Sequence, residues 1–278
     1  GKKLRWIAGV AVRDFSLGSV DTDKLNEGLD EDEKLPTPED VPGLYERYID
    51  WGLISENEKN GGLITTVKAG LVYDTRNTLQ NPSRGMWTEA VFVGSPSFLS
   101  DESFLKFSFT HRQYLSIFPD ILTFAGRVGF QQTVSGYTPF YMQPLMITST
   151  YTGAWNEGLG GQRSIRGVKR NRILGDGFIY TNLELRLIAK RFRLAGQNFY
   201  IGFNTFFDTG RVTDEIEMDI DEIPAQYVEP DEERFHQAAG VGLKIAMNWN
   251  FVLSVEYGQA FKKQDGDSSL YIALNYLF

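Results

Sequence analysis

One arginine and two carboxylates are the residues of this chain whose types and order suggest a built polar site. Arg166 lies near the end of a glycine-rich stretch, residues 160–168, and Glu184 and Asp208 follow on two later segments. Paired carboxylates can act as general acid and base. A guanidinium can instead bind both through its planar fork of N–H donors. The order of the residues favours this second role, in which Arg166 and the adjacent Gly167 hold a loop against the carboxylates; acid–base chemistry is the alternative.

Other catalytic arrangements are absent from the sequence. The chain has no cysteine and only two histidines, His111 and His236. Neither zinc-ligand spacing nor a serine–histidine–aspartate arrangement is present. The glycines near Gly160 precede a strand-like segment, whereas a phosphate-binding loop precedes a helix. We therefore expect no enzyme activity, no metal and no cofactor, and we expect the histidines to be solvated or to lie at a rim.

The overall composition narrows the class of protein that positions these residues. The chain has 278 residues, a net charge of -8, 42% hydrophobic and 14% aromatic residues, and a mean hydropathy of -0.27. No apolar run approaches the roughly 18 to 20 residues of a membrane-spanning helix. The absence of cysteine excludes a disulfide scaffold, and the acidic balance argues against nucleic acid as a partner. The aromatic and hydrophobic content argues against disorder.

Alternation of apolar and polar residues is the dominant pattern. In residues 199–208, Phe199, Ile201 and Phe203 alternate with small or polar residues. Similar segments give ten predicted strands, at 4–16, 62–74, 86–94, 103–117, 121–133, 177–190, 199–208, 240–249, 251–258 and 268–278. A soluble β-sandwich also alternates, but its strands have about five or six residues. Strands of nine to eleven residues predict an all-β fold, an antiparallel transmembrane β-barrel.

The two faces and the connections support this prediction. One face is apolar, and the other carries charges suited to a wet lumen, at Arg5, Arg13, Lys68, Lys106, Arg112, Arg127, Glu184, Arg186, Asp208, Lys244 and Glu256. Short turns, at 118–120 and at 249–250, alternate with long loops at about 17–61, 135–175 and 211–234. This asymmetry is typical of outer-membrane barrels, so we expect residues 1–278 to form one barrel domain. Aromatic residues near strand ends are candidates for interfacial girdles, namely Trp6, Tyr73, Trp87, Trp249, Tyr257 and Phe278.

The negative charge is concentrated in two of the long loops. Residues 17–62 contain thirteen acidic and four basic residues, and residues 214–233 contain ten acidic residues and no basic one. Solvation of the loops explains this composition; a cation site or a partner surface is the alternative. Residues 44–51 have the spacing of a short amphipathic helix, which would pack on the barrel rim or bind a partner.

The glycine-rich stretch resembles the signature of the BamA/TamA-like barrels of the bacterial surface antigen superfamily. In that family a Gly-Gly-x-x-(Val/Ile)-Arg-Gly-(Tyr/Phe) loop folds into the lumen. Residues 160–168 match it with Arg166 in the arginine position, with Val168 in place of the aromatic residue and with about one extra residue in the spacing. The resemblance implies that Glu184 and Asp208 are the acidic partners of Arg166.

Further matches follow in the same order along the chain. Residues 73–77, with Pro82 and Gly85, resemble a periplasmic turn of the family, and residues 257–260 resemble its penultimate strand. Residues 271–278 resemble the C-terminal signal recognised during outer-membrane insertion, with Tyr271, Ala273, Tyr276 and Phe278 as its characteristic positions. The matches span about residues 62–278.

The resemblance implies a bacterial outer-membrane location, contact with lipid, and partners among envelope proteins or assembly-complex subunits. It also implies insertion of outer-membrane proteins or export of client polypeptides through a seam between the first and last strands. Family barrels usually have more than ten strands and follow POTRA modules, for which there is no room before Leu4. The chain is thus either a small closed barrel or the C-terminal part of a larger one. A static pore or a membrane anchor for partners is the competing function.

Overall fold

A computed structural model describes residues 3–149, 153–216, 223–228, 232–248 and 251–278. Its main feature is one ten-stranded antiparallel sheet in which each strand pairs with the next along the chain. The strands are β1 (Leu4–Ser16), β2 (Gly61–Asp74), β3 (Gly85–Ser95), β4 (Phe104–Phe118), β5 (Leu122–Gly136), β8 (Gly177–Leu194), β9 (Gln197–Asp214), β10 (His236–Met247), β11 (Phe251–Ala260) and β12 (Ser268–Leu274). The predicted all-β antiparallel fold of ten strands is confirmed.

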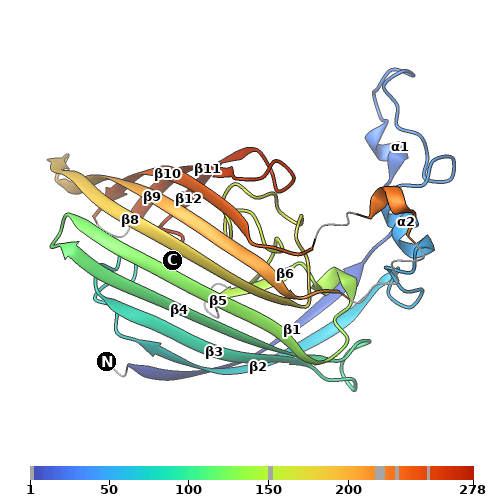
Figure 1. Cartoon of the computed structure of the whole chain (residues 1–278), viewed down its shortest axis with the longest axis horizontal. Coiled ribbons are helices and arrows are strands. Elements are labelled where there is room, and N and C mark those ends of the chain that lie inside the picture. The colour runs from blue at the N-terminus through green and yellow to red at the C-terminus, as the bar shows by residue number, and fades with distance from the viewer. Residues whose placement is uncertain (1–2, 150–152, 217–222, 229–231, 249–250) are drawn as a thin grey trace.

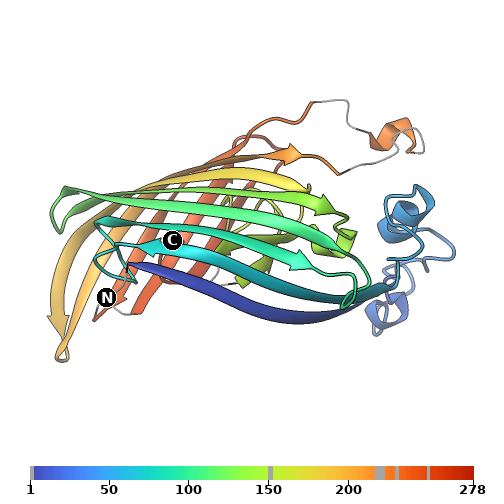
Figure 2. The same ribbon diagram turned by 90° about the horizontal axis from the view of Figure 1, so that it is seen from below.

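The sheet curves around a lumen, and β1 and β12 are its two edges (Figure 1). The connections at one end include residues 75–84, 119–121 and 195–196, and we call this end of the sheet the turn end. At the opposite end, the connection between β1 and β2 carries α1 (Thr22–Leu25) and α2 (Leu44–Asp50), which project beyond the strands (Figure 2). No helix in the described ranges is both long and apolar enough to cross a bilayer.

The connection between β5 and β8 enters the lumen, and we call residues 157–175 the lumen loop. This connection also contains η1 (Phe140–Met142) and a separate hairpin of β6 (Leu145–Ser149) and β7 (Gly153–Asn156). A further turn, η3 (Ala225–Tyr227), lies between β9 and β10. The lumen loop brings its own apolar core: Leu159, Ile165 and Val168 pack with Phe178 and Tyr180 of β8. The loop is therefore packed against the barrel wall as part of the fold.

The faces of the strands reverse the usual arrangement of a soluble protein. Apolar side chains such as Trp6, which is 78% exposed, and Ile272 point away from the lumen, whereas Arg127, Lys244 and Glu184 are buried inside. Because successive residues of a strand point to opposite faces, period-2 alternation is sufficient to produce both surfaces. An apolar outer face and a polar interior suit a sheet that is surrounded by lipid.

The prediction of an interfacial girdle position is wrong for two residues, Trp87 and Phe278. Trp87 is 2% exposed and lies on the inner face, where three guanidiniums contact its ring. Phe278 is 6% exposed and also lies inside. The reason is that β12 ends at Leu274, and the chain then turns into the lumen at Asn275, which has a left-handed φ of 68°. The predicted girdle residue Trp249 and the turn at 249–250 lie outside the described residues.

Candidate functional site

The lumen loop folds back on itself before it reaches the carboxylates. The backbone N–H of Gly161 donates to the carbonyl of Val168 (2.8 Å). The hydroxyl of Ser164 accepts from the N–H of Gly160 (2.7 Å) and donates to the same residue's carbonyl (2.8 Å). These bonds satisfy backbone groups that are buried from water, and they present the following arginine toward the wall formed by β8, β9 and β11.

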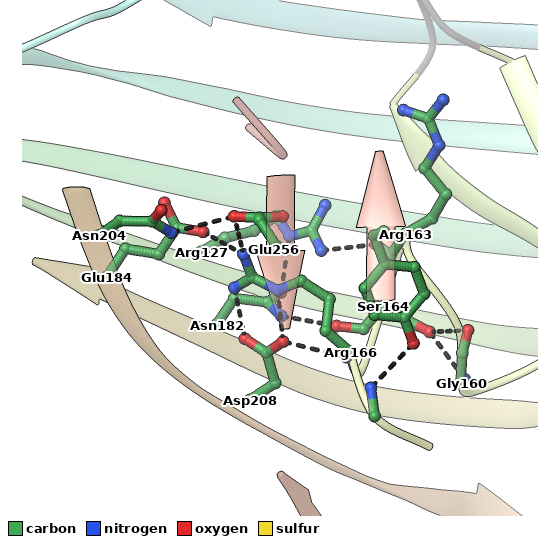
Figure 3. Close-up of polar contacts among 12 residues, drawn as sticks. Arg127, Gly160, Arg163, Ser164, Arg166, Asn182, Glu184, Asn204, Asp208 and Glu256 are labelled. Carbon is green, nitrogen blue, oxygen red and sulfur yellow. Dashed lines mark hydrogen bonds and ion pairs between the residues drawn. The ribbon is translucent and has the colours of Figure 1, made fainter. Parts of the chain in front are cut away.

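Arg166 is fully buried, and its side chain meets three carboxylates (Figure 3). Its Nε and Nη2 donate to the two oxygens of Asp208 on β9 (2.8 and 2.9 Å), which is a bidentate pair. Its Nη1 donates to Glu184 on β8 (2.6 Å) and to Glu256 on β11 (2.9 Å). The backbone N–H of Arg166 also donates to Asp208 (3.1 Å). One residue of the loop thus joins three strands of the wall, and we call this network the arginine clamp.

Two further cations balance the charge of the clamp. Nε of Arg186 donates to the second oxygen of Glu184 (2.7 Å), and Nζ of Lys244 donates to Glu256 (2.7 Å). Asn204 also donates to Glu256 (3.0 Å). The three carboxylates therefore face three buried cations. Balance matters because an uncompensated buried charge costs several kcal/mol.

Additional hydrogen bonds attach the lumen loop to both sides of the clamp. Nδ2 of Asn182 donates to the carbonyl of Ser164 (2.6 Å), and Nη2 of Arg127 donates to the carbonyl of Arg163 (2.6 Å). The hydroxyl of Tyr271 on β12 accepts from the N–H of Gly167 (2.9 Å). The loop is therefore bound from β5 to the edge strand β12, and Figure 3 shows the contacts of Asn182 and Arg127 with it.

Close contact between the backbones of the lumen loop and β11 explains why a glycine, Gly167, follows Arg166. Gly167 has a φ of 107°, and a Cβ there would lie 2.8 Å from the carbonyl carbon of Gln259 on β11. Across the contact, a Cβ on Gly258 would lie 2.7 Å from the carbonyl oxygen of Arg166. A side chain at either position would push the loop away from β11.

The structure brings together all four residues that the sequence assigns to the clamp: Arg166, Gly167, Glu184 and Asp208. Sequence reasoning did not assign Glu256 to it, although the alternation pattern places that residue on the lumen face. It also missed Asn182, a neutral residue that carries no charge signal. The strand register alone shows that Asn182 lies near the clamp, because Asn182 pairs with Asp208 in the β8–β9 ladder.

The geometry favours a structural role for these carboxylates. Asp208 accepts three hydrogen bonds from Arg166, and Glu184 binds two guanidiniums. Oxygens that are buried and already bonded to cations are poorly placed to take a proton from a substrate. Within the described ranges, no group of three or more histidine, aspartate or glutamate residues is placed to hold a metal ion.

The predicted C-terminal signal divides between two places. Tyr271 and Ala273 lie on β12, whereas Tyr276 and Phe278 belong to a tail, residues 275–278, that turns into the lumen. Nη2 of Arg186 donates to the carbonyl of Phe278 (2.9 Å), and its guanidinium lies 4.4 Å from the centre of the Tyr276 ring. The tail therefore contacts the same arginine that supports Glu184 in the clamp.

Hydrogen bonds also join the outer loops. Arg47 of α2 donates to the hydroxyl of Tyr227 in η3 (2.5 Å), and Tyr137 donates to the buried carboxylate of Glu58 (2.7 Å). Burial and this hydrogen bond raise the pKa of Tyr137. At Glu233, burial favours a higher pKa, but hydrogen bonds from His236 and from the N–H of Val212 outweigh it and hold the pKa below its usual value.

A curved ten-stranded sheet with an apolar exterior, a charged lumen and an internal loop held by an arginine defines an outer-membrane β-barrel. The Omp85 superfamily domain matches residues 18–275, and the chain belongs to the Omp85 superfamily. This match confirms the resemblance inferred from the glycine-rich stretch.

A solved structure shares the fold. The crystal structure of BamA from Haemophilus ducreyi lacking POTRA domains 1-3 is similar, with a TM-score of 0.58 and 16% sequence identity, over 98% of this chain and 50% of that chain. The chain thus spans about half the length of that structure. Comparison with curated proteins gives no significant match.

Proposed function

We propose that this chain assists the insertion of outer-membrane proteins or the export of polypeptides, in the bacterial outer membrane and within a larger envelope complex. The observation that carries the proposal is that β1 and β12 are the two edges of one sheet and each has a single paired neighbour. An unpaired edge offers a row of N–H and C=O groups that can bind an incoming strand. Strand addition needs no covalent step, and the proposal therefore needs no enzyme activity.

Membership of the Omp85 superfamily and the arginine clamp support this proposal in different ways. The clamp fixes the wall from β8 to β11, and the bond between Gly167 and Tyr271 extends it to β12. On the other side of the opening, β2 is the one strand in the described part of the chain that pairs with β1. In the proposed function, one edge is held by the lumen loop while the other is free to separate and receive a client. We propose that residues 1–278 act together as one barrel unit, with lipid, assembly subunits and clients as its partners.

Photocrosslinking in cells tests this function. A crosslinker at Ala8 on β1, or at Ile272 on β12, is expected to trap newly made outer-membrane proteins during their assembly. A crosslinker at Leu185 in the middle of β8, which faces outward on a strand with two neighbours, is the matched control. If neither edge ever traps a client while the reconstituted protein conducts ions strongly, the static pore is the better function, and the buried lumen charges would set its selectivity.

A further inference from the structure

The hairpin that joins β8 to β9, residues 188–200, lies at the turn end of the sheet (Figure 1). At this end the ladder between β5 and β8 stops at the pair of Leu122 and Leu187, whereas β8 continues to Leu194. The hairpin contains three basic residues and no acidic one. The basic residues, all exposed, are Lys190, Arg191 and Arg193. We call residues 188–200 the basic hairpin.

A β-bulge decides which face of the sheet each of these side chains takes. Before the bulge, even-numbered residues of β8 such as Glu184 and Arg186 face the lumen. The register of the β8–β9 ladder then shifts between Ile188 and Lys190, so that Lys190 pairs with Ile201, an outward-facing residue of β9. Bulges re-aim side chains in this way. Without this one, Lys190 would face the lumen and the two arginines of the hairpin would face lipid.

The shifted register also continues the apolar outer face of the barrel toward the tip of the hairpin. Phe192 pairs with Phe199, and their rings stack with centres 5.4 Å apart. Leu194 lies still closer to the tip and is 61% exposed. Lys190 is therefore on the lipid-facing side, with apolar side chains between it and the tip. A lysine in such a position extends its apolar stem along the surface and brings its ammonium group to the headgroups.

The two arginines lie on the other face of the basic hairpin. Arg191 donates to the carbonyl of Asp120, which connects the hairpin to the neighbouring turn between β4 and β5. Nε of Arg193 donates to the carbonyl of Gly196 at the tip (3.4 Å). Both guanidiniums remain charged at every physiological pH and match phosphate oxygens in geometry. The hairpin thus presents cations on both faces beside an apolar, aromatic segment.

Charge is divided between the two ends of the whole sheet. The connections 75–84 and 119–121 and the basic hairpin together contain five basic residues and one acidic residue. Arg76 among them is offset by Asp74 on β2 (3.0 Å), so the hairpin supplies most of the remaining positive charge. The two acidic loops, residues 17–62 and 214–233, lie at the opposite end. The barrel therefore directs its positive end toward the bilayer leaflet that surrounds the short turns.

We propose that the basic hairpin binds the headgroups of anionic phospholipids in this leaflet. An acidic protein would also complement the charge, but two observations favour lipid. Lys190 lies on the lipid-facing side, which a protein in the water phase does not reach. The stacked rings of Phe192 and Phe199 and the exposed Leu194 form the kind of aromatic and apolar anchor that sits at a membrane–water interface. The inference goes beyond the proposed function, since neither a client nor an assembly subunit takes part.

Fluorescence quenching in lipid nanodiscs tests the proposal. The chain has no cysteine, so a fluorophore on Ala195→Cys reports from the exposed tip of the hairpin alone. The nanodiscs contain phosphatidylcholine with a small share of either brominated phosphatidylglycerol or brominated phosphatidylcholine, and bromine quenches the fluorophore on contact. We expect stronger quenching by the brominated phosphatidylglycerol, and we expect this preference to fall as the salt concentration rises.

Lys190→Gln and Arg193→Gln are each expected to lower the preference for phosphatidylglycerol about fivefold at low salt. Lys190→Arg keeps the charge and should keep the preference. Lys263→Gln is the matched control, because Lys263 is exposed in the connection between β11 and β12 at the opposite end. Heat-modifiability on gels shows that each variant has folded.

Two results would overturn the proposal. One is equal quenching by the two brominated lipids in the otherwise unchanged chain. The other is a preference that stays the same in both Lys190→Gln and Arg193→Gln. A photocrosslinker at Leu194, used in cells, tests the competing partner. Adducts with lipid alone are expected, whereas a hairpin that shows no preference for phosphatidylglycerol and traps an acidic protein has that protein as its partner.

Discussion

At the scale of single residues, the clamp shows why a buried charge can be retained at the centre of a membrane protein. The guanidinium of Arg166 has four hydrogen bonds to carboxylates and also stacks on Phe206, 3.6 Å from the ring centre. Removal of one partner from such a network leaves the others unpaired and costs about 3–5 kcal/mol, which is far more than the loss of a surface pair. The clamp thus makes the position of the lumen loop conditional on one side chain.

Substitution of that side chain tests the clamp directly. Arg166→Ala is expected to release the lumen loop, to destabilise the protein by about 3–5 kcal/mol, and to make residues 157–175 sensitive to protease. Arg166→Lys is expected to recover only part of the stability, because lysine lacks the planar fork. Heat-modifiability and limited proteolysis measure both effects. Arg170→Ala, which changes an exposed arginine of the same loop, is the control; unchanged protection in Arg166→Ala would refute the role of the clamp.

A second substitution separates backbone strain from close packing. Gly167→Ala is expected to displace the loop, because its Cβ would collide with the backbone of β11 in addition to the cost of a positive φ. Gly196→Ala has a similar φ, 78°, with open space around the Cβ, and should cost only about 1–2 kcal/mol. The comparison uses the midpoint of heat-modifiability. Equal losses in the two variants would show that the contact with β11 contributes nothing.

At the scale of elements, the sequence predicts strands well and their ends poorly. Alternation depends on a local property, the opposite orientation of successive side chains, so all ten strands are recognisable without tertiary information. The inward turn of the tail depends on Asn275 and on a distant arginine, Arg186, which alternation does not describe. Trp87 is a different case, because alternation along β3 places it on the same buried face as Glu89, where its cationic neighbours come from three separate elements.

The clamp also divides into residues that a local sequence motif predicts and residues that enter it through contacts between distant parts of the chain. The glycine-rich stretch and its two acidic partners are found from motif order, because the family resemblance fixes which residues meet. Glu256 and Asn182 enter the clamp through strand register, and one sequence without an alignment does not specify register beyond neighbouring hairpins.

The connection between β9 and β10, which includes Glu233, should hold to these two strands in a way that depends on pH. The folded state holds the pKa of Glu233 below its usual value, so its stabilising effect is present above about pH 4.3, the ordinary pKa of glutamate, and is lost as the pH falls through the lower folded pKa. Pepsin cleavage near residues 232–235 is expected to increase below about pH 4. In Glu233→Gln this pH dependence should disappear. A wild-type loop that is equally protected at pH 5 and pH 3 would contradict the prediction.

At the scale of the whole molecule, the edges of the sheet set the strongest physical constraint. Lipid offers no hydrogen bonds to an exposed N–H or C=O, and each unsatisfied group costs several kcal/mol in hydrocarbon. β1 has thirteen residues and β12 has seven, so the two edges differ in the length of backbone that needs a partner. A bilayer should therefore contain this sheet with its edges covered by another strand, whether its own, that of a further segment or that of a client.

Amide hydrogen exchange measures whether the edge of β1 is covered. In an antiparallel pair, β1 gives only alternate amides to β2, and the intervening amides point toward the open edge. In lipid nanodiscs we expect all amides of β1 to exchange as slowly as those of β9, which has two neighbouring strands. Exchange of alternate β1 amides at rates near those of the outer loops would show that the edge is open to water. Protection throughout β1 in the purified chain, without any added protein, would further show that the edge of β1 is covered without a client. Addition of a client should then raise the exchange rate of the β1 amides. The clamp segment, residues 160–168, should stay protected.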